Sequence, residues 1–283
     1  MRLKDLFKGK TAKPPANNSP LGPSDANNYG AMLVQAADFG DAASIDSALA
    51  NGADINFCDT MGRTALMIAS EENNVDIFTK LMANRADARL VNGFDQSALH
   101  MAFRRAASKT IYDGLIGAKA PINLQDRHGA TPAFYAAQTG SSDGLESLAK
   151  EGADFTVANK DGRTPLMQAT GAWHTDAIDV LTKHACALDA QDKEGHTALM
   201  LAIFCSNEAL VEKFLKLGAN VHLKNGEGHT ASDLAREKGL SDATLALLDK
   251  TANAHIEPFR EGASDTITVM KRLSFKTPSG TAS

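Results

Sequence analysis

The stretch from Asn159 to Ala169, N-K-D-G-R-T-P-L-M-Q-A, predicts a tight turn that leads directly into a helix. Gly162 allows the left-handed backbone conformation that residues with a Cβ atom adopt only at a cost. Thr164 is placed where its hydroxyl caps the unpaired N–H groups at the start of the helix. Pro165 follows at the first helical position, where its fixed φ angle fits and its missing N–H costs nothing.

This stretch recurs along most of the chain. The residues equivalent to Thr164 are Ala31, Thr64, Ser97, Thr131, Thr197 and Thr230, and they are spaced by 33 residues, or by 34 between Ser97 and Thr131. A second turn follows about 21 residues after each of these markers, as in Gly152-Ala153-Asp154 and Gly218-Ala219-Asn220. A fixed period of this length is typical of a solenoid in which every unit packs only on its neighbours.

The segment Gly162-Arg163-Thr164-Pro165-Leu166, together with the later glycine-alanine-acid turns, resembles the ankyrin repeat. The resemblance covers about Asn28 to Thr251 and includes seven units, counting the terminal caps. It implies an all-α solenoid whose units each contain a hairpin-like turn, two antiparallel helices and a loop. The histidine that the family carries after the leucine occurs only as His100, so the hydrogen bonding of the other turns departs from the family pattern.

The domain boundaries follow from the same period. We expect a flexible segment over residues 1–28, the repeat domain over 29–251 and a mostly disordered tail over 252–283. The first of these segments is rich in Pro, Asn and Ser and has too few large apolar residues to bury a core of its own. No segment has the roughly 18 apolar residues that span a membrane, so we expect no stable membrane insertion.

The first ten residues, M-R-L-K-D-L-F-K-G-K, have a basic start but lack the apolar stretch of a signal peptide. Leu3, Leu6 and Phe7 alternate with basic residues in a pattern that fits one amphipathic helical turn. The pattern is consistent with a weak membrane-surface or partner contact, or with a solvated terminus.

Composition excludes several classes of function. Acidic residues outnumber basic ones, 34 to 29, and the net charge of −5 gives no general attraction to nucleic acid. Cys58, Cys186 and Cys205 lie at unrelated positions in different units and form neither a disulfide framework nor a zinc motif. Reduced thiols are typical of a cytoplasmic protein, which is the location that we expect.

The sequence contains no complete catalytic or phosphate-binding motif, so we expect neither enzymatic activity nor a cofactor. His196 and His229 occupy equivalent places in adjacent units. Equivalent atoms of packed helical units lie about 10 Å apart, too far for two histidine nitrogens to share a zinc ion at about 2 Å. We therefore predict no metal site and interpret both residues as exposed histidines at turn tips.

The third unit, Asn92 to Gln125, departs most from the pattern. Asp95 replaces the glycine of the first turn, Lys119 replaces that of the second, and one extra residue lies between Ser97 and Lys119. This unit is either a drifted repeat or part of a binding surface. The fourth and fifth units are regular at their turns.

The family resemblance places the turn tips and one side of each first helix on a concave face that binds partners. The residues predicted to line this face are Met61, Phe94, Met101, Arg104, Arg105, Tyr135, Gln138, Trp173, His174 and Phe204. Trp173 lies where other units have Gly40, Gly140 and Gly239, so the core pattern does not require it. Core burial of Trp173 and Phe204 is the alternative interpretation, and Met101 and Tyr135, next to the recurring alanines, are expected to be partly buried. Aromatic residues mixed with arginine match the composition of binding hot spots.

These features predict a non-enzymatic scaffold, a monomer in solution, that binds a protein partner. One alternative is a regulator or effector whose terminal segments carry the activity, which deletion of both segments would test. Another is a membrane-surface adaptor that uses residues 1–10, which flotation with anionic liposomes would test.

We predict that the third unit is the least stable part of the array, because Asp95 and Lys119 lack glycine's conformational freedom. A weak interface lowers stability locally in a solenoid. Amide hydrogen exchange should therefore be faster over residues 92–123 than in the fourth to sixth units. Uniform protection from the second unit to the sixth would contradict this expectation.

Overall fold

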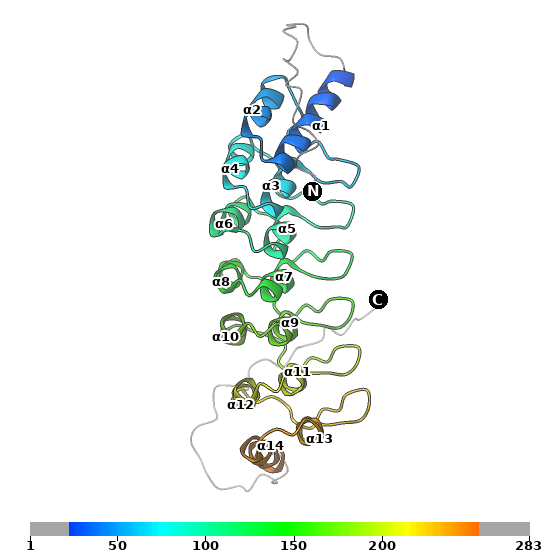
Figure 1. Ribbon diagram of the computed structural model, residues 1–283, viewed down its shortest axis with the longest axis vertical. Helices are drawn as coiled ribbons and strands as arrows, with labels where there is room; N and C mark the ends of the chain where they lie inside the picture. The colour runs from blue at the N-terminus through cyan, green and yellow to red at the C-terminus, as the bar shows by residue number, and fades with distance from the viewer. Residues whose placement is uncertain (1–22, 255–283) are drawn as a thin grey trace, which may run out of the picture.

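The computed structural model describes residues 23–254, which form fourteen α helices and no β strand (Figure 1). The predicted all-α solenoid is therefore confirmed for this part of the chain. The helices are α1 (Pro23–Phe39), α2 (Ala42–Ala50), α3 (Ala65–Glu71), α4 (Val75–Ala83), α5 (Ala98–Arg104), α6 (Lys109–Gly117), α7 (Pro132–Thr139), α8 (Ser142–Lys150), α9 (Pro165–Gly171), α10 (Thr175–Lys183), α11 (Ala198–Phe204), α12 (Glu208–Lys216), α13 (Ala231–Glu237) and α14 (Asp242–Ala254).

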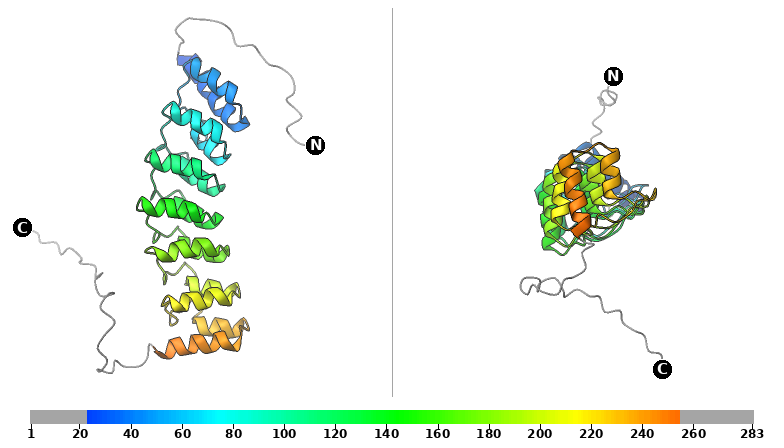
Figure 2. Two further views of the ribbon diagram at one scale, coloured as in Figure 1. Left: turned by 90° about the vertical axis from the view of Figure 1, so that its left-hand side faces the viewer. Right: turned by 90° about the horizontal axis from the view of Figure 1, so that it is seen from below.

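The helices stack as antiparallel pairs in two layers (Figures 1 and 2). The odd-numbered helices, which we call the inner helices, pack on one another from α1 to α13. The even-numbered outer helices cover the opposite side. The connections between pairs project beyond the inner helices on one side of the stack.

Threonine starts most of the inner helices, as the sequence predicts. The hydroxyl oxygens of Thr64, Thr131, Thr164 and Thr197 each accept a hydrogen bond, at 3.3 Å, from the backbone N–H three residues later. Each bond satisfies one of the donors that a helix N-terminus leaves unpaired. The alanine that follows each threonine after five residues is fully buried, as at Ala169.

Each of the six projecting connections is a hairpin that an Asp or Asn side chain holds from inside. The Oδ1 atom of the first residue accepts the backbone N–H groups two and four residues later, at 2.8–3.1 Å. The first residues of these hairpins are Asp59, Asn92, Asp126, Asn159, Asp192 and Asn225. One short side chain thereby satisfies two donors of a tight loop, which is the Asx turn in repeated form.

Successive hairpins are joined by a ladder of backbone hydrogen bonds. The N–H of Gly93 donates to the carbonyl oxygen of Met61 at 2.8 Å, and the N–H of Arg127 donates to that of Phe94 at 3.0 Å. The same contact links Lys160 to His128, Lys193 to Asp161 and Gly226 to Glu194, at 2.7–2.9 Å. The hairpins therefore form one continuous structure along the array.

The substituted turn residues adopt the backbone conformation that glycine has in other units. Asp95 has a φ angle of +59° and Lys119 one of +63°. The extra residue of the third unit lengthens the turn between α5 and α6, where the Ser108 N–H donates to Asn73 Oδ1 at 2.8 Å.

The fifth unit was predicted to be regular at its turns, but Ala185 replaces its second glycine. In place of the glycine turn, His184 is extended and a bridge forms between Phe155 and Cys186.

The ends of the array differ from the predicted boundaries. Helix α1 begins at Pro23, within the predicted flexible segment 1–28, and α14 continues to Ala254, beyond residue 251. The first unit therefore has helix in place of a hairpin. The rest of that segment, residues 1–10 among it, and nearly all of the predicted tail 252–283 lie outside the described residues.

We predict that Lys119→Gly raises the free energy of unfolding by about 1 kcal/mol, because a left-handed residue with a Cβ atom costs about this much. Lys150→Gly is the matched control, since glycine in a helix costs up to about 1 kcal/mol relative to alanine. Urea denaturation of both variants should give changes of opposite sign. A loss of stability in Lys119→Gly would show that its turn is not strained.

Candidate interaction surface

The hairpin tips and the exposed side of the inner helices form the surface on which binding was predicted. Met61 and Phe94 lie at the tips of adjacent hairpins, with 47% and 41% of their surfaces exposed. Arg104, Gln138 and Phe204 occupy equivalent positions on α5, α7 and α11, seven residues after the helix-starting marker. These five residues contribute to one face, which we call the inner surface.

Met101 and Tyr135 do not belong to the inner surface, although the sequence placed them there. Their exposed fractions are 2% and 9%, because the adjoining inner helices and the hairpin cover them. The Tyr135 hydroxyl donates a hydrogen bond to Asp126 Oδ2 at 2.7 Å, and Gln96 Nε2 donates to the same oxygen at 2.9 Å. Tyr135 therefore ties its helix to the base of a hairpin and contributes to stability rather than to direct binding.

This buried cluster shifts two pKa values in opposite directions. Burial, together with the hydrogen bond to Asp126, raises the pKa of Tyr135 to about 12. Burial alone raises the pKa of Asp126, but the hydrogen bonds from Gln96 and Tyr135 bring it below its usual value. Both shifts favour a neutral phenol that donates to an ionised carboxylate.

His100 fills a second buried position in the third unit. Its Nδ1 atom accepts the backbone N–H of Ser97 at 3.1 Å, so Nε2 carries the proton and donates to the Leu124 carbonyl oxygen at 3.0 Å. Burial lowers the pKa of His100. The neutral ring thus ties the start of α5 to the loop before the next hairpin.

Arg104 and Arg105 converge on one carboxylate. Arg104 Nη2 contacts Glu71 Oε1, and Arg105 Nε lies 3.6 Å from the same oxygen. Both arginines are exposed, whereas the Glu71 side chain is largely buried. The pair therefore presents about one net positive charge on the inner surface rather than two.

Aromatic residues of the inner surface are partly covered by cations of neighbouring units. The Arg127 guanidinium lies 5.5 Å from the centroid of the Phe94 ring. Phe204 is half-buried, with Lys238 Nζ at 5.4 Å from its centroid and the His196 ring edge-on at 5.0 Å. His196, predicted to be exposed, is half-buried because of this contact.

Trp173 lies at the end of the inner layer, in the turn between α9 and α10, rather than on the helix itself. It has 59% of its surface exposed and a φ angle of +64°. Its neighbour His174 is held by the fourth unit, because His174 Nε2 lies 3.1 Å from the Gln138 carbonyl oxygen and its ring covers Gly140. No ring or cation contact to Trp173 exists among the described residues.

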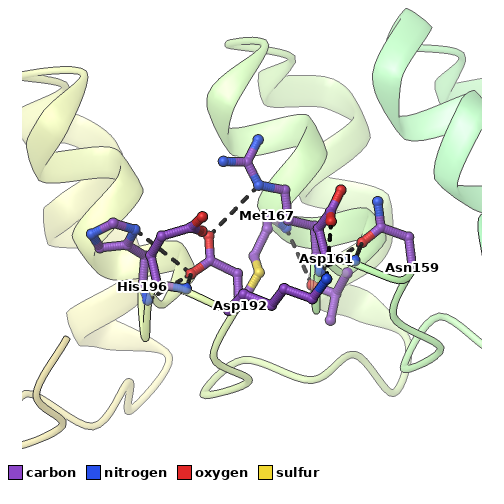
Figure 3. Close-up of polar contacts among 9 residues, drawn as sticks. Asn159, Asp161, Met167, Asp192 and His196 are labelled. Carbon is purple, nitrogen blue, oxygen red and sulfur yellow. Dashed lines mark hydrogen bonds and ion pairs between the residues drawn. The ribbon is translucent and has the colours of Figure 1, made fainter. Parts of the chain in front are cut away.

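Asp192, Glu194 and His196 are the one group of potential metal ligands in the described part of the chain, with ligand atoms within 4.8 Å of one another. Figure 3 shows Asp192 and His196 of this group. Asp192 Oδ1 already accepts the N–H groups of Glu194 and His196, and Oδ2 lies 3.6 Å from Arg163 Nε. In the other five hairpins that the structure describes, Oδ1 of the first Asp or Asn accepts the equivalent N–H groups, although no group of metal ligands is present there. The position of Asp192 beside Glu194 and His196 is therefore explained by the hairpin.

The sequence prediction missed the Asp and Asn residues that hold the hairpins. The signal was present, since an Asp or Asn occurs five residues before six of the seven markers, from Asp59 to Asn225. It also missed Gln96, whose role depends on a carboxylate 30 residues away and leaves no local pattern.

The comparisons with known proteins agree with this geometry. The family model for ankyrin repeats (3 copies) matches residues 33–126, 71–159, 105–192 and 134–225. The chain therefore belongs to the ankyrin-repeat family. No helix in the described part of the chain is long and apolar enough to span a membrane.

Two individual proteins show how far the similarity extends. A 114-residue stretch, 39% of this chain, is 32% identical to neurogenic locus notch homolog protein 1 of Xenopus laevis. The match spans only 4% of that relative's length. The crystal structure of the ankyrin repeat domain of Bcl-3, a member of the IkappaB protein family, superimposes with a TM-score of 0.65 at 22% identity. That match covers 77% of this chain and 97% of the other, and it supports the fold alone.

We predict that Asp126→Asn weakens the acid sensitivity of the fold. The folded-state pKa of Asp126 is lowered, so its ionised form stabilises the protein above the unfolded pKa of about 3.9, and this stabilisation is lost as the pH falls further. Urea denaturation at pH 7 and at pH 3 should show a smaller difference in the variant. Asp95→Asn, an exposed carboxylate of an adjacent hairpin, is the control. An unchanged difference in Asp126→Asn would contradict the assignment.

Proposed function

We propose that this array is a non-catalytic module that binds a partner protein on the inner surface, across the third to sixth units. Ankyrin repeats generally mediate interactions between proteins, which supports the broad class of function. The finer assignment rests on residues of this chain, above all on Trp173. We also infer that the module acts as a monomer in the cytoplasm, without a cofactor, a metal ion or nucleic acid.

The observation that carries the proposal is that an exposed tryptophan, Trp173, occupies a left-handed position of a turn. A side chain with a Cβ atom costs about 1 kcal/mol or more in a left-handed conformation. Glycine occupies this position in three other units, and the smaller residues Asn73, Ala106 and Ser206 occupy it in the remaining three. The mostly exposed ring makes no aromatic or cation contact with any residue that the structure describes. Exposed tryptophan is among the residue types most enriched at binding hot spots.

The surface around Trp173 indicates what kind of partner fits. Gly171 and Ala172, which precede Trp173, are small, and the indole ring is mostly exposed. Arg104 and Arg105 present limited positive charge because Glu71 neutralises part of it. A partner surface of mixed apolar and polar character therefore matches better than an extended acidic peptide.

We predict that Trp173→Gly has opposite effects on folding and on binding. Relief of the left-handed strain should raise the free energy of unfolding by about 1 kcal/mol. Loss of an aromatic anchor should cost about 2 kcal/mol or more of binding free energy, so the dissociation constant should rise more than about tenfold. Denaturation and calorimetric titration with a partner isolated from native lysate measure the two quantities.

The control for this experiment is Phe39→Ala, because Phe39 is an exposed aromatic residue of the first unit, far from the inner surface of the third to sixth units. It should bind the partner like the unmodified protein. Normal binding by Trp173→Gly would place the site elsewhere. A loss of stability in Trp173→Gly would show that the ring supports the fold.

A further inference from the structure

The ladder of hairpins has an open end at the second unit. In each later hairpin, the residue after the first Asp or Asn donates its N–H to the tip of the preceding hairpin. The equivalent donor in the first hairpin is Thr60, and its N–H has no acceptor among the described residues. The acceptor is missing because residue 28, one period before Met61, lies in α1 rather than at a hairpin tip.

A groove opens beside this unpaired N–H. It has a volume of about 470 Å³ and lies between α1 and the first hairpin. Val34 and Ile68 form its apolar floor, and Phe57, Cys58 and Thr60 line its hairpin side. Phe57 packs so closely on α1 that a Cβ atom at Gly30 would lie 2.4 Å from its ring, which fixes this wall of the groove.

The charge of the groove is also uncompensated. Asp38 of α1 lines it, is exposed, and has no ion-pair or hydrogen-bond partner among the described residues. The second carboxylate that lines the groove, Asp59, is paired with Arg63 at 2.9 Å and is therefore not available to bind a cation of the occupant. An occupant that satisfies this groove brings a backbone carbonyl for Thr60, an apolar side chain for the floor and a cation for Asp38.

We propose that residues 1–10 of this chain are that occupant and extend the ladder by one strand-like contact. Their sequence combines Leu3, Leu6 and Phe7 with Arg2, Lys4, Lys8 and Lys10. Extended peptides that add to an exposed ladder gain affinity from main-chain hydrogen bonds and specificity from alternate side chains. The proposal concerns the first two units, whereas the proposed partner binding lies across the third to sixth units.

The reach of the chain is sufficient. Residues 11–22 span up to about 40 Å when extended. The rise along α1 from Pro23 to Asp38 is only about 23 Å. A connection of this length gives an effective concentration on the order of millimolar, which favours this segment over an equally matched peptide of another protein at low concentration.

Amide exchange at Thr60 in the full-length protein tests the proposal, compared with a variant that lacks residues 1–10. With a millimolar effective concentration and a millimolar dissociation constant, the segment is bound about half the time, so its removal should speed Thr60 exchange about twofold. The Gly93 amide, whose acceptor is internal, is the matched control and should not change. Adding a synthetic peptide of residues 1–10 at millimolar concentration should restore the slower exchange.

A second variant separates the contact from effects on folding. Asp38→Lys, at an exposed site, should speed Thr60 exchange in the full-length protein and leave Gly93 exchange and the helical circular dichroism signal unchanged. Equal Thr60 exchange with and without residues 1–10 would overturn the proposal. Protection that persists in the deletion variant and grows with protein concentration would also overturn it, because a second copy would then occupy the groove.

Discussion

The structure depends on the hairpin that an Asp or Asn side chain closes from within. Oδ1 of Asn159 satisfies two N–H groups of its own loop, and this leaves the next N–H free to reach the preceding hairpin. Six such loops therefore connect into a ladder that runs along the stack of units and fixes the spacing of neighbouring units. A buried backbone donor is costly when it is unpaired. Every unit between the ends of the array must therefore keep these hydrogen bonds.

The same constraint explains which parts of the fold the sequence could predict. Thr164 and Pro165 act locally, so their roles at the helix start were confirmed as predicted. The left-handed turns at Asp95 and Lys119 follow from the position of glycine in other units. The helical conformation of residues 23–28 was not predicted, since their polar composition carries no apolar period.

The candidate surface was less predictable, for two physical reasons. Met101 and Tyr135 share a helix position that faces the adjoining unit, and their burial depends on contacts from residues far away in the chain. Trp173 follows the end of α9, at the margin of the inner surface. Its position depends on where the helix ends and not on the period of the helix, so the sequence pattern placed it less well. Exposed residues such as Phe94 and Arg104 were easier to place, because hairpin tips and every seventh residue after a marker recur at a fixed spacing.

Under the proposed function, the residues for stability and for binding are separate within each unit. The hairpin Asp and Asn residues, the threonine caps and the buried alanines recur because stacking requires them, whereas Arg104, Gln138 and Phe204 differ at one equivalent position. Residues that vary between units and are not needed for stacking are the ones that we propose for recognition. Trp173 is one of them, and it is present despite the cost of its left-handed conformation.

The central claim, that partners bind the hairpin tips and the inner layer, is tested most directly by amide exchange of the array with and without an isolated partner. The account predicts slower exchange in the complex at the Phe94 hairpin tip and at residues 171–174, with little change in α8, α10 and α12. Protection confined to these outer helices would contradict it.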